Sequence, residues 1–124
     1  MKDGFISVAV ATPEVEVANC VKNAAATVQL VEEAAARGVK LLVLPELGLT
    51  AYTCGDLFLQ PTLLRGAEAA LAAVLDATRG KELLVAVGLP VAVQQTLYNC
   101  AAILHDGKIL GVVPKVHVPN YSEF

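Results

Sequence analysis

The sequence is poor in charged and aromatic residues and contains no tryptophan. Charged residues make up 17% and aromatic residues 5% of its 124 residues, whereas 56% are hydrophobic. Soluble domains are on average about 25% charged and about 45–50% apolar. This shortage of charge favours strands that are covered on both faces, or faces that normally meet another part of the same protein. No internal repeat or flexible linker divides residues 1–124, so we expect one domain or a portion of one.

The chain also lacks a long hydrophobic run and a basic stripe, and we expect no secretory leader. Charged residues, glycine and proline interrupt its most apolar region at Gly38, Lys40, Pro45 and Glu46, whereas a membrane span needs about 20 apolar residues. The net charge is −3, and the nine lysines and arginines are scattered. We therefore expect no membrane or nucleic-acid partner, and a cytoplasmic protein.

Cysteine is scarce too, and its spacing forms no metal-binding pattern. Cys20, Cys54 and Cys100 lie far apart with no CxxC pair, which favours reduced, buried thiols over disulfides or a zinc site. His105 and His117 have no suitably spaced partner, so both are expected to be structural. We expect neither a metal nor a cofactor in this segment.

Hydrophobic periodicity predicts alternating strands and helices. A helix is expected between an Asn19 N-cap and Gly38, and a second between Pro61 and Gly80. Buried strands are expected at residues 5–11, 39–44 and 83–88. Strands that alternate with helices pair in parallel through right-handed crossovers. Asp56, in the loop before the second helix, is interpreted as a helix N-cap.

The last part of the chain predicts a hairpin instead. Residues 97–104 and 108–113 flank an Asp106-Gly107 pair, which favours a tight antiparallel turn. The whole pattern therefore indicates an α/β fold with a mixed sheet.

Two strand ends each carry one charge. Glu46 follows the strand at 39–44, and Lys115 follows Pro114 at the end of the hairpin. We expect these to be neighbouring strands, whose carboxyl ends bring both charges into one pocket. Low dielectric there would strengthen their coupling and suit acid–base chemistry. A glutamate or lysine after a strand is more often a solvated surface residue, so the pairing carries the hypothesis.

Several motifs in order resemble one family. They are Leu44-Pro45-Glu46-Leu47-Gly48, Cys54-Gly55-Asp56-Leu57-Phe58, Tyr98-Asn99-Cys100-Ala101, Gly111-Val112-Val113-Pro114-Lys115 and Pro119-Asn120-Tyr121-Ser122-Glu123-Phe124. Together they resemble the start of the nitrilase-like glutamine amidohydrolase domain of the glutamine-dependent NAD synthetases. The resemblance implies a nitrilase-like four-layer α-β-β-α sandwich, of which this chain would be the incomplete N-terminal part.

In that family a Cys–Glu–Lys triad hydrolyses an amide through a thioester, and the resemblance implies two of those roles here. Glu46 matches the general base and Lys115 the ammonium that stabilises the oxyanion. The nucleophilic cysteine of the family lies beyond the segment that matches Phe124, so the fragment alone is expected to be inactive. Neither Cys54 nor Cys100 matches it.

Substrate contacts are implied as well. Tyr52 and Tyr121 each lie six residues past a catalytic position, and the resemblance places both, with Glu123, beside the glutamine site. Packing roles for the two tyrosines remain equally open. Ala51 stands where the family more commonly has glycine, which would strain the loop if its φ is positive.

The function implied is glutamine hydrolysis that supplies ammonia for ATP-dependent NAD synthesis. ATP and magnesium would belong to a missing C-terminal synthetase domain, and glutamine would be the substrate of this segment. Two alternatives stay open: another nitrilase-superfamily amidase or carbamoylase, and a non-catalytic association fragment. Because segments after Phe124 would normally cover the sheet, we also expect exposed apolar surface and a homo-oligomer.

Overall fold

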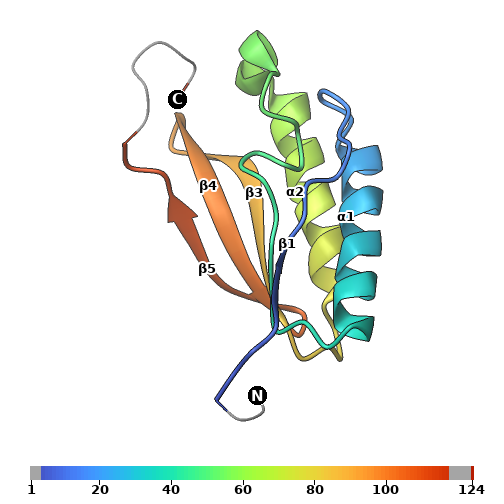
Figure 1. Cartoon of the computed structure of the whole chain (residues 1–124). Helices are drawn as coiled ribbons and strands as arrows, with labels where there is room; N and C mark the ends of the chain where they lie inside the picture. The colour runs from blue at the N-terminus through green and yellow to red at the C-terminus, as the bar shows by residue number, and fades with distance from the viewer. Residues whose placement is uncertain (1–3, 118–123) are drawn as a thin grey trace.

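The computed structural model describes residues 4–117 and residue 124. It shows one mixed sheet with two helices on a single face (Figure 1). In chain order the elements are β1 (Val8–Val10), α1 (Cys20–Ala36), β2 (Leu41–Val43), the short 3₁₀ helix η1 (Gly55–Leu59), α2 (Pro61–Ala77), β3 (Leu84–Val93), β4 (Thr96–His105) and β5 (Lys108–Pro114). The strands lie in the order β1-β2-β3-β4-β5.

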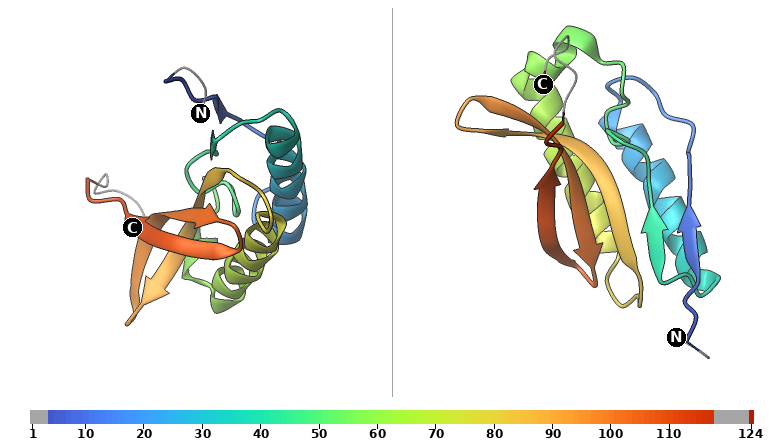
Figure 2. Two further views of the ribbon diagram at one scale, coloured as in Figure 1. Left: turned by 90° about the horizontal axis from the view of Figure 1, so that it is seen from below. Right: turned by 60° about the vertical axis from the view of Figure 1, so that its left-hand side comes forward.

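The first half of the sheet is parallel, as predicted. Val8 pairs with Leu41 and Leu41 with Leu84, so β1, β2 and β3 run in the same direction. Helices α1 and α2 connect these strands and pack side by side on the same face of the sheet (Figure 2). This arrangement follows from right-handed crossovers, which return each helix to one side.

The second half of the sheet is antiparallel. The predicted hairpin between β4 and β5 is confirmed: His105 pairs with Lys108, and the turn residues Asp106 and Gly107 have φ values of +44° and +73°. Two successive residues with positive φ are typical of the tight turn that an Asp-Gly pair favours.

A second hairpin, between β3 and β4, was missed from the sequence. The expected strand ended at Gly88, but β3 continues to Val93, which pairs with Thr96 across a Gln94-Gln95 turn. Pro90 is tolerated within β3 because β2 pairs only with Leu84–Ala86. Beyond that point the β3 edge needs no N–H to donate to β2.

The helix ends follow the predicted signals with one exception. The Asn19 side chain accepts a hydrogen bond from the Lys22 N–H at 3.1 Å and caps α1, Gly38 has φ +75°, and Pro61 is the first residue of α2. The interpretation of Asp56 as an N-cap is wrong. It lies inside η1, whose N-cap is Cys54, two residues earlier in the chain.

The core lies between the helices and the sheet. Val31 of α1, Val74 of α2 and Val85 of β3 are fully buried there. The opposite sheet face carries exposed apolar side chains, including Val8 and Val10. The described residues therefore form two layers, one of helices and one of sheet, which is consistent with part of the expected four-layer sandwich. No helix in this part of the chain has the length and apolar character needed to cross a bilayer.

Candidate active site

Glu46 lies on a tight turn that follows β2. The Leu44 N–H donates to the Ala86 carbonyl at 3.0 Å, and the Leu49 N–H donates to the Gly88 carbonyl at 3.1 Å. Both bonds anchor the turn to β3. Leu47, next to Glu46, is buried and has φ +54°. This left-handed backbone costs a side chain about 1–2 kcal/mol, so burial of Leu47 must hold the conformation.

Gly88 permits the turn to cross close over β3. A Cβ atom on Gly88 would lie 2.7 Å from the Pro45 carbonyl oxygen and closer still to the Leu47 nitrogen. Real Cβ atoms do not approach backbone so closely, so only glycine fits this position without a shift. The absent side chain thus brings Glu46 across the sheet towards β4 and β5.

Lys115 and Asn99 both bind the Glu46 carboxylate. Lys115 Nζ lies 2.9 Å from Glu46 Oε1, and Asn99 Nδ2 donates a hydrogen bond to the same oxygen. The expectation that two neighbouring strands carry the charges is wrong, since β3 and β4 separate β2 from β5. Three strand spacings amount to about 14 Å. The turn over Gly88 and the long lysine side chain cover that distance together.

The pair is electrostatically coupled but open to water. The hydrogen bond from Lys115 lowers the pKa of Glu46 below its ordinary value, against a smaller upward effect of burial, and Asn99 lowers it further. The carboxyl group is therefore ionised at neutral pH, as a general base requires. The side chains of Glu46 and Lys115 are 40% and 36% exposed. The described residues do not provide the dry environment expected from the sequence.

A cavity of about 320 Å³ adjoins this pair. Its lining comes from the ends of β2 to β5: Val43, Leu44, Pro45, Glu46, Ala86, Val87, Gly88, Asn99, Cys100, Ala101, Val113, Pro114 and Lys115. Most of these groups are apolar. An anionic base, a cation and an amide donor at the edge of such a cavity suit the cleavage of a small polar substrate by proton transfer.

Of the three substrate contacts predicted from the sequence, the structure describes only Tyr52. Tyr52 is 55% exposed and is not among the described residues that line the cavity. Tyr121 and Glu123 lie outside the described residues, so their roles stay predictions. His117 is exposed. Ala51 has φ +73°, so this loop position does have the positive φ that glycine tolerates better.

The three thiols are buried and free, as predicted. Cys54 Sγ donates to the Thr50 carbonyl at 3.0 Å, within the loop after Glu46. Cys100 lines the cavity, but burial raises its pKa, so this thiol is protonated at neutral pH and a weak nucleophile. Among the described residues, no cluster of three histidine, cysteine or acidic side chains could hold a metal ion.

Asn99 is the site residue that sequence reasoning missed. The Tyr98-Asn99-Cys100-Ala101 motif contributes to the family resemblance, but its pattern predicts no role for Asn99. One signal was present, because an asparagine in a strand of small and apolar residues is expected to have a specific partner when buried. No local pattern indicates that this partner is Glu46.

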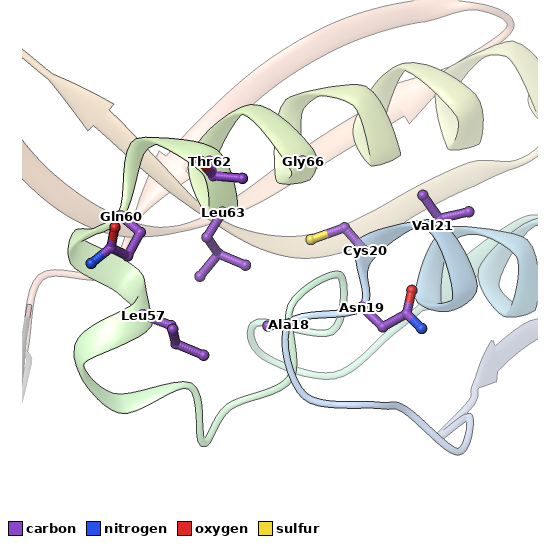
Figure 3. Close-up of a pocket in the computed structure, with 9 residues that line it drawn as sticks. All are labelled: Ala18, Asn19, Cys20, Val21, Leu57, Gln60, Thr62, Leu63 and Gly66. Atoms are coloured by element: carbon purple, nitrogen blue, oxygen red, sulfur yellow. The ribbon is translucent and has the colours of Figure 1, made fainter.

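A second, larger cavity of about 470 Å³ lies between the first turns of α1 and α2. Figure 3 shows its lining residues, which are Ala18, Asn19, Cys20, Val21, Leu57, Gln60, Thr62, Leu63 and Gly66. It shares no lining residue with the cavity at Glu46. None of these residues carries a charge, so this cavity lacks an acid–base pair.

Comparison with known proteins identifies the family. The chain is 34% identical over 121 residues to a glutamine-dependent NAD(+) synthetase of Mycobacterium leprae, covering 98% of this chain and 18% of that protein. The crystal structure of a glutamine-dependent NAD(+) synthetase from Cytophaga hutchinsonii matches with a TM-score of 0.87 at 27% identity. That match covers 93% of this chain and 20% of the other. The predicted resemblance is confirmed, and the chain spans about a fifth of the length of these relatives.

The fold is shared more widely. An amidase from Nesterenkonia sp. matches with a TM-score of 0.81 at 16% identity, covering 99% of this chain and 47% of that protein. This likeness confirms the predicted nitrilase-like fold. Residues 7–124, nearly the whole sequence, match the carbon-nitrogen hydrolase family. The chain belongs to the carbon-nitrogen hydrolase family.

Proposed function

We propose that this chain forms half of a glutaminase site within a longer, cytoplasmic protein that makes NAD. The observation that carries the proposal is the ion pair between Glu46 and Lys115, which lines a cavity of substrate size. The likeness to glutamine-dependent NAD(+) synthetases over 98% of the chain supports glutamine as the amide and NAD synthesis as the use of the ammonia. ATP and magnesium would act in the synthetase part of that protein.

In the proposed reaction, Glu46 Oε2 accepts the proton of a cysteine thiol supplied by another part of the protein. Both described donors bind Oε1, so Oε2 is the oxygen oriented for proton transfer. The thiolate attacks the side-chain amide carbon of glutamine and forms a C–S bond. Lys115 stabilises the resulting oxyanion, and protonated Glu46 returns its proton to the nitrogen, so the C–N bond breaks and ammonia leaves.

The second half of the reaction releases glutamate. Glu46 removes a proton from water, and the hydroxide attacks the thioester carbon. The C–S bond breaks, and the thiolate recovers its proton from Glu46. An ionised Glu46 at neutral pH, which Lys115 maintains, is required at the start of both halves.

The full-length protein tests this proposal directly. We expect it to form NAD from the adenylated dinucleotide precursor with either glutamine or ammonium as nitrogen source, and to release one glutamate for each glutamine used. Simple aliphatic amides and carbamoyl compounds serve as comparison substrates. Hydrolysis of these compounds without any NAD formation would replace the proposal with the amidase or carbamoylase alternative.

A further inference from the structure

We propose that Asn99 is a positioning residue that fixes Glu46 and Lys115 relative to each other, an inference that rests on the proposed function. Its side-chain Nδ2 donates to Glu46 Oε1. Its backbone carbonyl accepts a hydrogen bond from the Lys115 N–H at 2.7 Å. One residue of β4 thus binds the carboxylate from the turn after β2 and the backbone of the lysine after β5.

The surroundings make Asn99 suited to this role. It is only 6% exposed and lies mid-strand, paired with Pro90 of β3, so its backbone is fixed on both sides. A neutral amide can donate to a carboxylate without competing for its proton, whereas an aspartate in its place would repel it.

The two contacts of Asn99 separate experimentally. Replacement of the side chain removes the bond to Glu46 but keeps the backbone bond to Lys115, because every residue has that carbonyl. Loss of the amide would let the Glu46 carboxylate rotate about its side-chain bonds. Displacement of a reacting group by about 1 Å can cost roughly 100-fold in rate.

The test uses the full-length protein with Asn99→Ala and the isosteric Asn99→Asp. For Asn99→Ala we expect kcat for glutamine hydrolysis to fall about 10- to 100-fold with little change in KM, and NAD synthesis from ammonium to remain at the wild-type rate. The acid limb of the pH–rate profile should move to higher pH, and further in Asn99→Asp. Asn99→Asp keeps the side-chain volume, so it tests the positioning role even if the alanine variant fails to fold.

Asn19→Ala provides the control for a general loss of stability. It removes one hydrogen bond at the start of α1, so it should lower the melting temperature and leave the pH–rate profile unchanged. If Asn99→Ala and Asn99→Asp change only the melting temperature, the positioning role is overturned. Glu46→Gln distinguishes failure of the proposed function from failure of this inference. Full glutamine hydrolysis in Glu46→Gln overturns the proposed function. Loss of hydrolysis in Glu46→Gln, with unaffected hydrolysis in both Asn99 variants, overturns the inference about Asn99 alone.

Discussion

Glu46 and Lys115 are 69 positions apart in the sequence, yet their side chains meet at 2.9 Å. The contact depends on a turn that crosses β3 and on the return of β5 to the same end of the sheet. Because the pair is partly exposed, dissolved salt screens it. Its chemistry should therefore respond to both pH and ionic strength.

The pH dependence of glutamine hydrolysis should shift with salt. The working form of Glu46 is the carboxylate, and Lys115 lowers its pKa, so activity is lost as pH falls through that lowered value. High salt weakens the pair and raises the pKa, so the loss should begin at higher pH. Profiles of kcat/KM at low and high ionic strength measure this shift.

Synthesis from ammonium serves as the control for that measurement, since it bypasses Glu46. If the acid limb of the kcat/KM profile stays in place or moves to lower pH at high salt, the result contradicts electrostatic coupling between Glu46 and Lys115. The free energy of unfolding should depend on pH in the same direction as the activity. Any stability from a carboxylate with a depressed pKa is present above its unfolded-state pKa and disappears as pH falls.

Gly88→Ala should displace the turn that carries Glu46. The added methyl group would overlap the backbone of Pro45 and Leu47. Overpacking of this kind typically costs about 1–3 kcal/mol, and the shift should also slow glutamine hydrolysis. Urea unfolding and steady-state kinetics measure the two effects.

Gly111→Ala is the matched control, because nothing lies within 4 Å of a Cβ atom built on Gly111 in β5. It should leave both stability and rate near wild type. Equal behaviour of the two alanine variants would contradict the close approach at Gly88.

Asn23 should matter more for stability than the cap residue Asn19. Its fully buried side chain accepts from the Glu16 N–H and donates to the carbonyls of Glu16 and Leu49. Asn23→Ala removes the partner of the Glu16 N–H and of the Leu49 carbonyl, at about 1–3 kcal/mol for a buried group, whereas the Glu16 carbonyl keeps the hydrogen bond from the Asn19 N–H. Asn19→Ala removes a cap worth about 1 kcal/mol.

Chemical denaturation of both variants provides the comparison. We expect the lower midpoint for Asn23→Ala, with a similar slope. A midpoint at or above that of Asn19→Ala would show that the contact between the loop before α1 and the loop after β2 does not depend on this asparagine.

The cysteines of this chain should be dispensable for catalysis. Cys100 lines the cavity, but burial raises its pKa, and Cys54 donates to a backbone carbonyl instead. Cys54→Ala and Cys100→Ala should therefore hydrolyse glutamine at close to the wild-type rate. Loss of hydrolysis in Cys100→Ala, with synthesis from ammonium intact, would identify Cys100 as the nucleophile.

The chain on its own should self-associate. The sheet face opposite the helices exposes Val8, Val10 and Val113, and β5 forms an open edge. Exposed apolar strands at an edge promote pairing between molecules. Light scattering should show a mass that rises with concentration, and a monodisperse monomer would contradict this expectation.

The parts of the fold that could be predicted from the sequence are those that depend on local signals. Hydrophobic periodicity and helix caps placed both helices, and Asp106-Gly107 placed one hairpin, because these features depend on neighbouring residues. The other hairpin was missed because tolerance of Pro90 depends on the short pairing of β2, which is a property of the sheet.

In the candidate site, too, local patterns predicted some residues, whereas others depend on the folded sheet. Glu46 and Lys115 stood out as charges after apolar strands, but the role of Asn99 depends on the turn crossing over Gly88, which no local pattern encodes. The exposure of the ion pair was also unpredicted. It follows from the open sheet face, whereas the charge pattern predicts a pocket of low dielectric.

The most direct measurement of the central claim is the ratio of glutamine-driven to ammonium-driven NAD synthesis in full-length Glu46→Gln. The matched control is Glu82→Gln, which alters a more exposed ion pair with Lys40 at the other end of the strands. We predict that Glu46→Gln loses glutamine-driven synthesis and keeps the ammonium-driven rate, while Glu82→Gln retains both. A Glu46→Gln protein with an unchanged ratio would contradict the account.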